Sequence, residues 1–308
     1  MNLLLLFIAV GVTFSERCAE LVANKGAVAV MDLRNGRLIV ATDSDILFAH
    51  RYPPGSVAKI LTSMAAAKAG VDFSQNFVCK GFEIGTGDRF LKGDTLKCSL
   101  RGGHGKVDFH RALLASCNLY FQNLAYKLKP QELADIYFSL GLNNKVGVNL
   151  PSELASIVQI PANDSAKLAF AIGQGSALQL TPVAMLAMIS GVAKGGEFLR
   201  PHLEPGGQQI LASFSEKSCL ADIRLFLRDA VRSGTGKNAD IAEVNVAGKT
   251  GSSTVLGSWR TYGWFAGFAP FEEPQIAVVV FLERGEGKDA AKIAGMVISD
   301  YFHRRHGD

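Results

Sequence analysis

The pattern of apolar and polar positions predicts a sheet built from both ends of the chain. Near the amino terminus, residues 27–33 and 37–42 read as strands on either side of Asn35-Gly36. This pair tolerates positive φ and is therefore a strong signal for a hairpin turn. Three more strand-like runs lie toward the carboxyl terminus, at residues 244–250, 261–269 and 275–282. Because their connections are short, we expect these three strands to form an antiparallel meander.

The sequence between the two groups of strands is mostly helical in its periodicity. Helices are expected from about Ser56 and at residues 108–127, 130–140 and 181–194, with a last amphipathic helix at residues 289–303. Asp108 and Thr181 are expected to be N-caps, and Thr181 is followed by proline at the first helical position. The pattern predicts an α/β protein of the α+β type. In it, a five-stranded antiparallel sheet is flanked by helices, and a mostly helical subdomain is inserted at about residues 71–240.

The first 20 residues predict export. An apolar run of about 12 residues matches the core of a signal peptide and is shorter than the roughly 20 residues that span a membrane. Thr13 and Ser15 place small side chains before a cleavage point, so residues 1–15 are expected to be a signal peptide, whether cleaved or retained as an anchor. The polar Glu16 and Arg17 argue against a buried helix here and against lipidation of Cys18. We expect the protein in the periplasm or at the outer face of the cytoplasmic membrane.

Composition excludes two broad classes of protein. The chain has 308 residues, 48% of them hydrophobic and 19% charged, which is typical of a compact globular protein and not of a disordered one. The net charge of +4 comes from 32 basic and 28 acidic side chains that are spread along the chain. Without a basic stripe, nucleic-acid binding is not expected. There is no internal repeat or linker-like tract, so we expect a single two-lobed unit.

Cysteine and histidine spacing does not predict a metal site or a cofactor. None of the five cysteines follows a C-x-x-C spacing, so a structural zinc site is not expected. In an exported protein, Cys79 and Cys98 could form a disulfide across the polar segment between them, which is a hypothesis. His104 and His110 lack a nearby third ligand in the sequence and are expected to be loop or surface histidines. Cys117 is expected to serve packing.

Ser56 and Lys59 have the spacing of a nucleophile and its base. Pro53-Pro54-Gly55 cannot continue a preceding helix, so Ser56 falls at the start of the next one, with Lys59 one turn along the same face. A serine hydroxyl needs a base, and a lysine can serve when burial and positive charge lower its pKa. Taken alone, the pair is better explained as a capping serine and a solvated lysine, because Ser-x-x-Lys recurs by chance in many helices.

Two later motifs change that interpretation. The sequence has Ser116-Cys117-Asn118 in "LLASCNLYF" and Lys249-Thr250-Gly251 in "VAGKTGSSTV". Ser-x-x-Lys, Ser-x-Asn and Lys-Thr-Gly in this order form the signature of active-site serine penicillin-recognising enzymes. The chain resembles the transpeptidase domain of penicillin-binding proteins, most closely the class B type. The resemblance extends through "VGVNLPSE", "AIGQGSALQLTPVAMLAMISGVAKGG", "RSGTG" and "WFAGFAP" and covers roughly residues 26–302.

The resemblance implies roles for the residues of the first two motifs. Ser56 would attack the carbonyl carbon of the substrate, and Lys59 would accept its proton. Ser116 would relay a proton to the leaving amine, while Asn118 would orient Lys59 and the substrate amide. Lys249, from the third motif, would add positive potential that keeps Lys59 neutral. An acyl transfer needs these types of group: a nucleophile, a base and a proton donor for the leaving group.

The third motif would bind the substrate. By the same resemblance, Thr250 would contact the substrate carboxylate, and Gly251 would let the substrate backbone approach an edge strand. The backbone N–H groups of Ser56 and Ser252 would form the oxyanion hole. The resemblance implies neither a metal ion nor a cofactor.

The implied function is that of a peptidoglycan D,D-transpeptidase. Its partners would be peptidoglycan stem peptides, β-lactam antibiotics as covalent inhibitors, and other cell-wall synthesis proteins. The transpeptidase domain would span residues 22–308, a bare catalytic domain without the N-terminal module usual in class B proteins. Three alternatives stay open: a D,D-carboxypeptidase, a class D-like β-lactamase, and a non-turnover sensor of β-lactams or wall peptides. Glu153 is the one candidate for the water-activating group of a β-lactamase.

A nucleotide-binding site is not expected. The segment "SGTGK" lacks the first glycine and the final hydroxyl of a phosphate loop.

Overall fold

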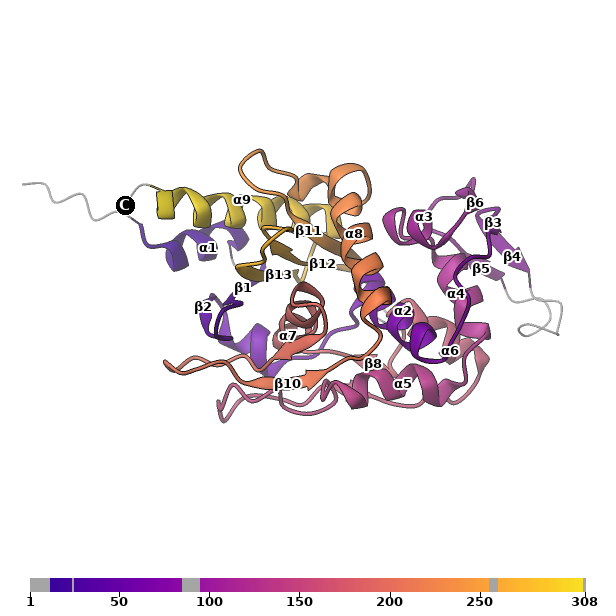
Figure 1. The fold of residues 1–308 in the computed structure, drawn as a ribbon, viewed down its shortest axis with the longest axis horizontal. Coiled ribbons are helices and arrows are strands. Elements are labelled where there is room, and N and C mark those ends of the chain that lie inside the picture. Colours follow the sequence, from indigo (N-terminus) through magenta and orange to yellow (C-terminus); the bar gives the residue numbers. More distant parts are fainter. Residues whose placement is uncertain (1–11, 24, 85–94, 255–259, 307–308) are drawn as a thin grey trace, which may run out of the picture.

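A five-stranded antiparallel sheet forms the centre of the protein (Figure 1). The structure is a computed structural model that describes residues 12–23, 25–84, 95–254 and 260–306. The strand order is β11-β12-β13-β1-β2, which confirms the predicted sheet from both chain ends, and β11 is an edge strand. The strands are β1 (Gly26–Asp32), β2 (Leu38–Ala41), β11 (Ala247–Thr254), β12 (Thr261–Ala269) and β13 (Ile276–Leu282).

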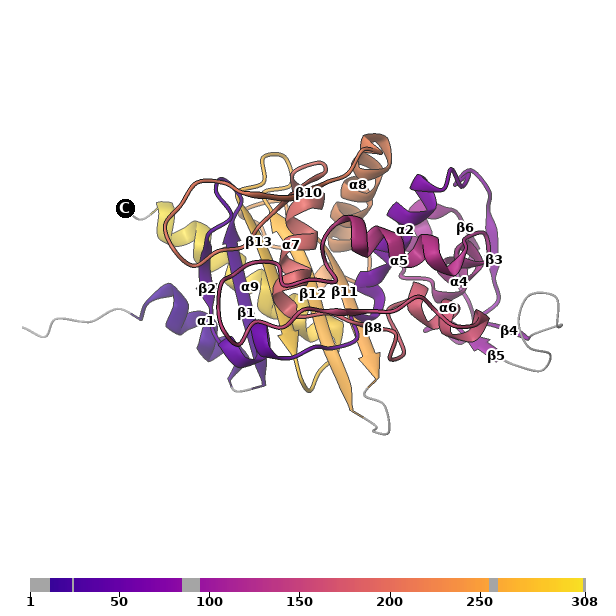
Figure 2. The same cartoon turned by 90° about the horizontal axis from the view of Figure 1, so that it is seen from below.

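Helices cover both faces of this sheet, as Figure 2 shows. Along β13, Val279 and Phe281 belong to the core shared with α7 (Pro182–Ala193), whereas Val278 and Val280 belong to the core shared with α9 (Gly287–His306). This alternation follows from the two-residue period of a strand, and the strand is buried on both sides. Every residue of α7 is buried, since this helix packs against the sheet and also against β9 (Glu197–Leu199) and α8 (Lys217–Ser233).

The rest of the chain contributes helices and short ladders. The helices are α2 (Lys59–Lys68), α3 (Phe109–Leu114), α4 (Asn118–Tyr126), α5 (Pro130–Ser139), α6 (Asp164–Ala171) and α8 (Lys217–Ser233). The ladders pair β3 (Phe77–Cys79) with β6 (Gly105–Val107), β4 (Phe82–Ile84) with β5 (Thr95–Lys97), β7 (Ile157–Val158) with β8 (Leu178–Gln179), and β9 (Glu197–Leu199) with β10 (Ile210–Ser213). The sequence does not predict these ladders because strands of two to four residues are too short for an alternating pattern to show.

The amino-terminal residues correct one expectation. The polar residues Glu16 and Arg17 do not prevent a helix, because α1 (Phe14–Val22) runs through them. Glu16 completes a capping box with Thr13, while Cys18 and Val22 on the opposite face are buried. The predicted cleavage point after Ser15 falls inside α1, and residues 1–11 of the expected signal peptide lie outside the described residues. Among the described helices, none has the length and apolar character needed to cross a membrane.

The prediction of one continuous helix at residues 108–127 is wrong. The chain forms α3 and α4 instead, separated at Ser116, whose φ of 57° is left-handed. A residue in this conformation cannot continue a right-handed helix. The predicted caps are confirmed: the Asp108 side chain accepts from Arg111 N (2.8 Å), and Thr181 caps α7 with Pro182 in its first turn.

The turn that precedes α2 is fixed from two sides. The carbonyl of Pro53 accepts hydrogen bonds from Trp264 Nε1 (3.0 Å) and Ser253 Oγ (2.7 Å) on the sheet. On the other side, Gly55 N donates to the carbonyl of Gly173 (2.9 Å), in the loop after α6. A Cβ on Gly173 would lie 2.0 Å from Gly55 O, and both glycines have positive φ. The two backbones can therefore approach this closely only with glycine at residue 173.

The close contact between Gly173 and Gly55 predicts that replacing Gly173 lowers the stability of the protein. Gly173→Ala should lower the free energy of unfolding by about 2 kcal/mol or more, since positive φ strain adds to a backbone clash. Gly70→Ala is the matched control, because Gly70 has φ of 72° against 73° for Gly173 but nothing within 4 Å of its Cβ position. The control should lose only about 1 kcal/mol. Equal losses for the two variants in denaturant titrations would contradict the close packing.

Candidate active site

Ser56 and Lys59 lie next to each other at the beginning of α2. A 3₁₀ turn at Gly55–Ala58 leads into the α-helix, which begins at Lys59. The Nζ of Lys59 lies 3.0 Å from Ser56 Oγ, and the lysine side chain is 0% exposed. The alternative of a solvated lysine is therefore wrong. A buried amine within hydrogen-bonding distance of a partly exposed hydroxyl has the geometry of a base beside a nucleophile.

Oxygen atoms of the second motif complete the surroundings of the amine. Lys59 Nζ donates to the carbonyl of Ser116 (2.7 Å) and to Asn118 Oδ1 (2.7 Å), and it lies 3.1 Å from Ser116 Oγ. Because the Ser116 carbonyl oxygen and the Asn118 amide oxygen can only accept, these two contacts use two N–H groups of the Lys59 amine. A neutral amine keeps its lone pair for the hydroxyl groups of Ser56 or Ser116, which can donate. The predicted approach of the second motif to Lys59 is thus present in the structure.

The break between α3 and α4 positions this second motif. Ser116 has the left-handed φ of 57° and is buried, and Cys117 then takes an extended conformation as the N-cap of α4. Asn118 becomes the first residue of α4. This backbone path lets the carbonyl and hydroxyl of Ser116 and the amide of Asn118 all reach Lys59. A left-handed serine is strained and persists where its surroundings hold it.

The third motif brings a second buried lysine to the same place. Lys249 on β11 is 0% exposed, and its Nζ donates to the carbonyl of Thr250 (3.1 Å). Thr235, after α8, lies 3.5 Å from Lys249 Nζ and accepts from Thr250 Oγ1 at 2.9 Å. Thr235 is a site residue that the sequence analysis missed. The signal for it in the sequence is the "RSGTG" segment, whose resemblance to the family does not by itself imply a role for Thr235.

Burial lowers the pKa of both lysines. The pKa of Lys59 falls to about 7, chiefly by desolvation, with nearby Cys117 and Cys98 acting in the opposite direction. The pKa of Lys249 is also well below its usual range, because of burial first and then the charge of Lys59. Two ammonium groups so close together repel each other, so protonation of one disfavours protonation of the other. That Lys249 carries the positive charge while Lys59 is neutral stays a prediction.

A cleft of about 340 Å³ opens above these groups. Ser56, Ser116, Asn118, Thr250, Gly251 and Ser252 from the predicted set line it, together with Ser99, Ile172, Gln174, Thr235, Glu286, Gly287 and Lys288. Gln174 Nε2 donates to the carbonyl of Ser252 (3.2 Å). The structure therefore brings all predicted site residues to one cleft, with Lys59 and Lys249 buried beside it.

Glycines allow the first and third motifs to approach closely. A Cβ on Gly55 would lie 2.7 Å from Ser252 O and 3.1 Å from Ser252 N, and a Cβ on Gly251 would lie 2.7 Å from Pro54 O. The backbone before Ser56 thus packs directly on the edge strand β11. This proximity fits the predicted oxyanion hole of Ser56 and Ser252 N–H groups, which stays a prediction.

Glu153 lies outside the set of residues that line the cleft. Its side chain is 2% exposed, and its carboxylate oxygens accept from the backbone N–H groups of Gly147 (2.9 Å) and Val148 (3.0 Å). A carboxylate occupied in this way organises its own loop and is not available to activate water at Ser56.

Cysteine and histidine side chains depart from their predicted roles. Cys79, Cys98, His104 and Cys117 come together so that their ligand atoms all lie within 4.8 Å of one another. His104 lies in a loop and is partly exposed, as predicted, but residues distant in sequence bring three thiols next to its ring. The hypothesised Cys79–Cys98 bridge is not present, since both thiols are free. His110 instead pairs with Asp229 (2.9 Å). Within the described residues, the three thiols and His104 are the group that could hold a metal ion.

Comparison with solved structures identifies the same fold. The penicillin-binding protein PBP2 of Helicobacter pylori, solved in complex with MreC, has a TM-score of 0.84 at 23% identity, covering 94% of this chain and 62% of that one. Penicillin-binding protein A of Mycobacterium tuberculosis, solved as an imipenem acyl-enzyme, has a TM-score of 0.83 at 21% identity, covering 94% and 78%.

Two curated proteins are similar to this chain in sequence as well. The peptidoglycan D,D-transpeptidase MrdA of Acinetobacter baumannii is 28% identical over 291 residues, and stage V sporulation protein D of Bacillus subtilis is 29% identical over 280 residues. The matches cover 82% and 81% of this chain but 42% of each relative, so the chain spans less than half of their length. The family model of the penicillin-binding protein transpeptidase domain matches residues 26–302. The chain therefore belongs to the penicillin-binding protein transpeptidase domain family.

Proposed function

We propose that the protein is a peptidoglycan D,D-transpeptidase that forms an acyl-enzyme on Ser56 and cross-links stem peptides. The observation that carries the proposal is the contact of Ser56 Oγ with the buried amine of Lys59 at 3.0 Å. A protein that only bound β-lactam or wall peptide, without forming an acyl-enzyme, would have no need of a desolvated lysine beside Ser56. The name of the Acinetobacter baumannii relative supports the same activity.

The first chemical step is acylation of Ser56. Lys59 Nζ accepts the hydroxyl proton as Ser56 Oγ bonds to the carbonyl carbon of the donor peptide, and the negative charge moves to the carbonyl oxygen. Backbone N–H groups of Ser56 and Ser252 stabilise that oxygen. Collapse of the intermediate breaks the C–N bond. The proton then passes from Lys59 to the leaving amine through Ser116 Oγ, which lies 3.1 Å from Nζ.

The third motif recognises the carboxylate of the donor peptide. Thr250 and Thr235, joined at 2.9 Å, present hydroxyl groups to the cleft, and Lys249 lies behind them. A bound carboxylate would favour the proton on Lys249 and therefore a neutral Lys59, because opposite charge raises the pKa of Lys249. Substrate binding would in this way prepare the base for the reaction.

An amine acceptor is favoured over water for release of the acyl group. Glu153 is committed to its own loop and does not line the cleft. A carboxylated lysine, as in class D β-lactamases, would have to displace Ser116 O and Asn118 Oδ1, each 2.7 Å from Lys59 Nζ. A D,D-carboxypeptidase would admit water to the acyl group with Lys59 as the same base, so the product formed from a stem peptide distinguishes it from a transpeptidase.

The proposed setting follows from the sequence and the relatives. Residues 1–15 would direct export, and the transpeptidase domain, residues 22–308 with the subdomain inserted at about 71–240, would act in the periplasm or at the outer face of the cytoplasmic membrane. Peptidoglycan stem peptides would be the substrates and β-lactams covalent inhibitors. The Helicobacter pylori relative was solved with MreC, and we propose that this chain also has cell-wall synthesis partners.

Fluorescent penicillin tests the nucleophile. Wild-type protein should carry covalent label, and Ser56→Ala should carry none, because the hydroxyl that forms the ester is removed. Ser74→Ala, at an exposed serine outside the cleft, is the control and should be labelled like the wild type. In-gel fluorescence with circular dichroism of each variant gives the answer. Unlabelled but folded wild-type protein would end the proposal.

The pKa of Lys59 predicts how acylation depends on pH. The base works when neutral, so the acylation rate constant should rise as pH increases through about 7, where Lys59 loses its proton. Below that pH the rate should fall about tenfold per unit. Lys249, Cys98 and Cys117 are the titratable groups that also influence Lys59. Stopped-flow acylation between pH 5 and 9 measures the profile, and a flat profile would contradict a lysine base.

Glu153→Gln separates a transpeptidase from a water-activating enzyme. The penicillin adduct should persist equally long on variant and wild type, because Glu153 does not reach the acyl group. Stability should fall by about 1–2 kcal/mol, as charge-assisted bonds to Gly147 and Val148 are weakened. Mass spectrometry over time measures the adduct. An adduct lost within seconds from wild type but retained by the variant would assign Glu153 to deacylation.

A further inference from the structure

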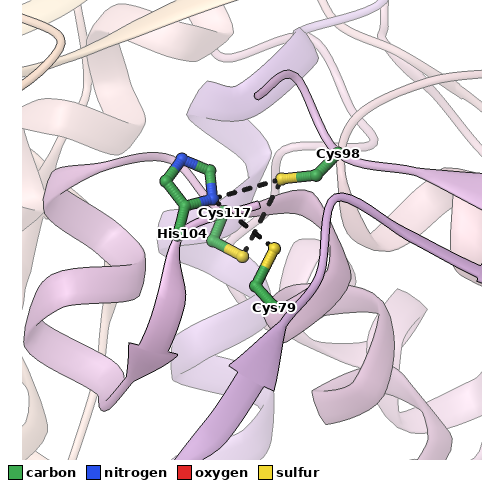
Figure 3. A group of neighbouring side chains, drawn as sticks. All are labelled: Cys79, Cys98, His104 and Cys117. Carbon is green, nitrogen blue, oxygen red and sulfur yellow. Dashed lines mark hydrogen bonds between the residues drawn. The ribbon is translucent and has the colours of Figure 1, made fainter. Parts of the chain in front are cut away.

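Four metal-binding side chains meet beside the second motif, as Figure 3 shows. Cys79 ends β3, Cys98 follows β5, His104 precedes β6, and Cys117 caps α4. The Nδ1 of His104 lies 3.4 Å from Cys98 Sγ and 3.6 Å from Cys79 Sγ, and the sulfurs of Cys98 and Cys117 are 3.9 Å apart. The three cysteines are buried, and His104 is partly buried.

We propose that Cys79, Cys98, His104 and Cys117 bind one zinc ion. Thiolates and imidazole are the ligands that zinc takes in structural tetrahedral sites. With zinc–sulfur bonds of about 2.3 Å and zinc–nitrogen bonds of about 2.0 Å, neighbouring ligand atoms lie roughly 3.5–3.8 Å apart. The observed separations of 3.4, 3.6 and 3.9 Å are close to those values. On binding, the three thiols release three protons to solvent, and the neutral imidazole coordinates without losing one.

The backbone around the ligands is already packed for such a site. Cys98 N donates to the carbonyl of Gly81 (2.8 Å). Gly103 has φ of 78°, and a Cβ there would lie 2.2 Å from the carbonyl oxygen of Cys79 and 2.6 Å from Gly81 N. The loop that precedes His104 therefore lies directly against the end of β3. This packing fixes the directions from which the ligands converge.

The small ladders pack on the main core through Val107, Phe77 and Leu96 but leave much of their other apolar surface exposed. β3, β4, β5 and β6 have three residues each, and isolated two-stranded ladders are marginal in water. Val78, Phe82 and Ile84 on these strands are more than half exposed, so they contribute little buried apolar area. A metal ion that joins the ends of three strands to α4 would add to the stability of these ladders.

The site would also position the catalytic machinery. Cys117 stands between Ser116 and Asn118, whose oxygens contact Lys59, and its own side chain does not face the cleft. A zinc–sulfur bond at Cys117 would hold the left-handed Ser116 and the start of α4 in place. The metal would thus be a positioning element for the second motif and would take no part in the chemical steps.

Metal analysis tests the binding. Protein purified from the exported fraction should contain one zinc per chain, and cobalt replacement should give the thiolate-to-cobalt absorption of a tetrahedral site. Cys98→Ser and His104→Ala should lose stoichiometric metal. Cys219→Ser and His110→Gln, at a buried cysteine and a histidine outside the cluster, should keep it. Folded wild-type protein that takes up no zinc under reducing conditions, or that contains a disulfide among Cys79, Cys98 and Cys117, would overturn the site.

Removal of the metal tests the positioning role. Chelation should lower the thermal midpoint by several degrees and slow acylation by β-lactam about tenfold or more, and added zinc should restore both. The metal content and thermal midpoint do not depend on the proposed transpeptidase activity, so failure of that proposal would leave these two readouts intact. An unchanged acylation rate after complete removal of zinc would refute the positioning role.

Discussion

The desolvated amine of Lys59 is the constraint on which the rest of the site depends. Its nitrogen lies among oxygen atoms of Ser56, Ser116 and Asn118 and has no exposure to water. Burying an ammonium group in this way is costly, so the pKa falls to about 7 and the neutral base becomes accessible. The same burial requires that every surrounding group be held in place, because a misplaced oxygen would leave the amine without a partner. The architecture around the site can be understood as the means of holding those groups.

Two kinds of support converge on the cleft. The sheet fixes the first and third motifs, since Trp264 and Ser253 bind the Pro53 carbonyl and glycines let the turn before Ser56 pack on β11. Within the part of the chain that the structure describes, no hydrogen bond from the sheet reaches the second motif. It lies between two short helices, next to small ladders whose apolar side chains are partly exposed. A left-handed Ser116 in that setting needs a local restraint, and the Cys79, Cys98, His104 and Cys117 cluster is placed to give it.

Sequence patterns predict the sheet and the site well for a physical reason. The strands β1 and β13 are long apolar runs with clear ends, and Thr181 and Asp108 carry local capping signals that operate within four residues. Ser56, Lys59 and the later motifs are recognisable because the proposed acyl transfer restricts which residue types can serve. The break at Ser116 could not be predicted, because the apolar periodicity continues across it and the left-handed residue is not glycine. Thr235 is harder to predict, since a single hydroxyl in a glycine-rich loop has no periodic pattern and the resemblance of "RSGTG" to the family does not by itself assign it a role.

The metal-ligand cluster shows where local spacing ceases to be informative. In short zinc motifs, two ligands share one turn, so their spacing reveals them. Here Cys79, Cys98, His104 and Cys117 come from four separate elements. The pairing of β3 with β6 and of β4 with β5, together with the packing of α4 on β3 and β5, brings them within 4.8 Å. Those ladders are themselves too short to predict. The ligands and the ladders depend on each other: the strands bring the sulfurs together, and coordination of the sulfurs would hold the strands. Such mutual dependence ties the stability of the small ladders to the conformation of Ser116 and hence to the environment of Lys59.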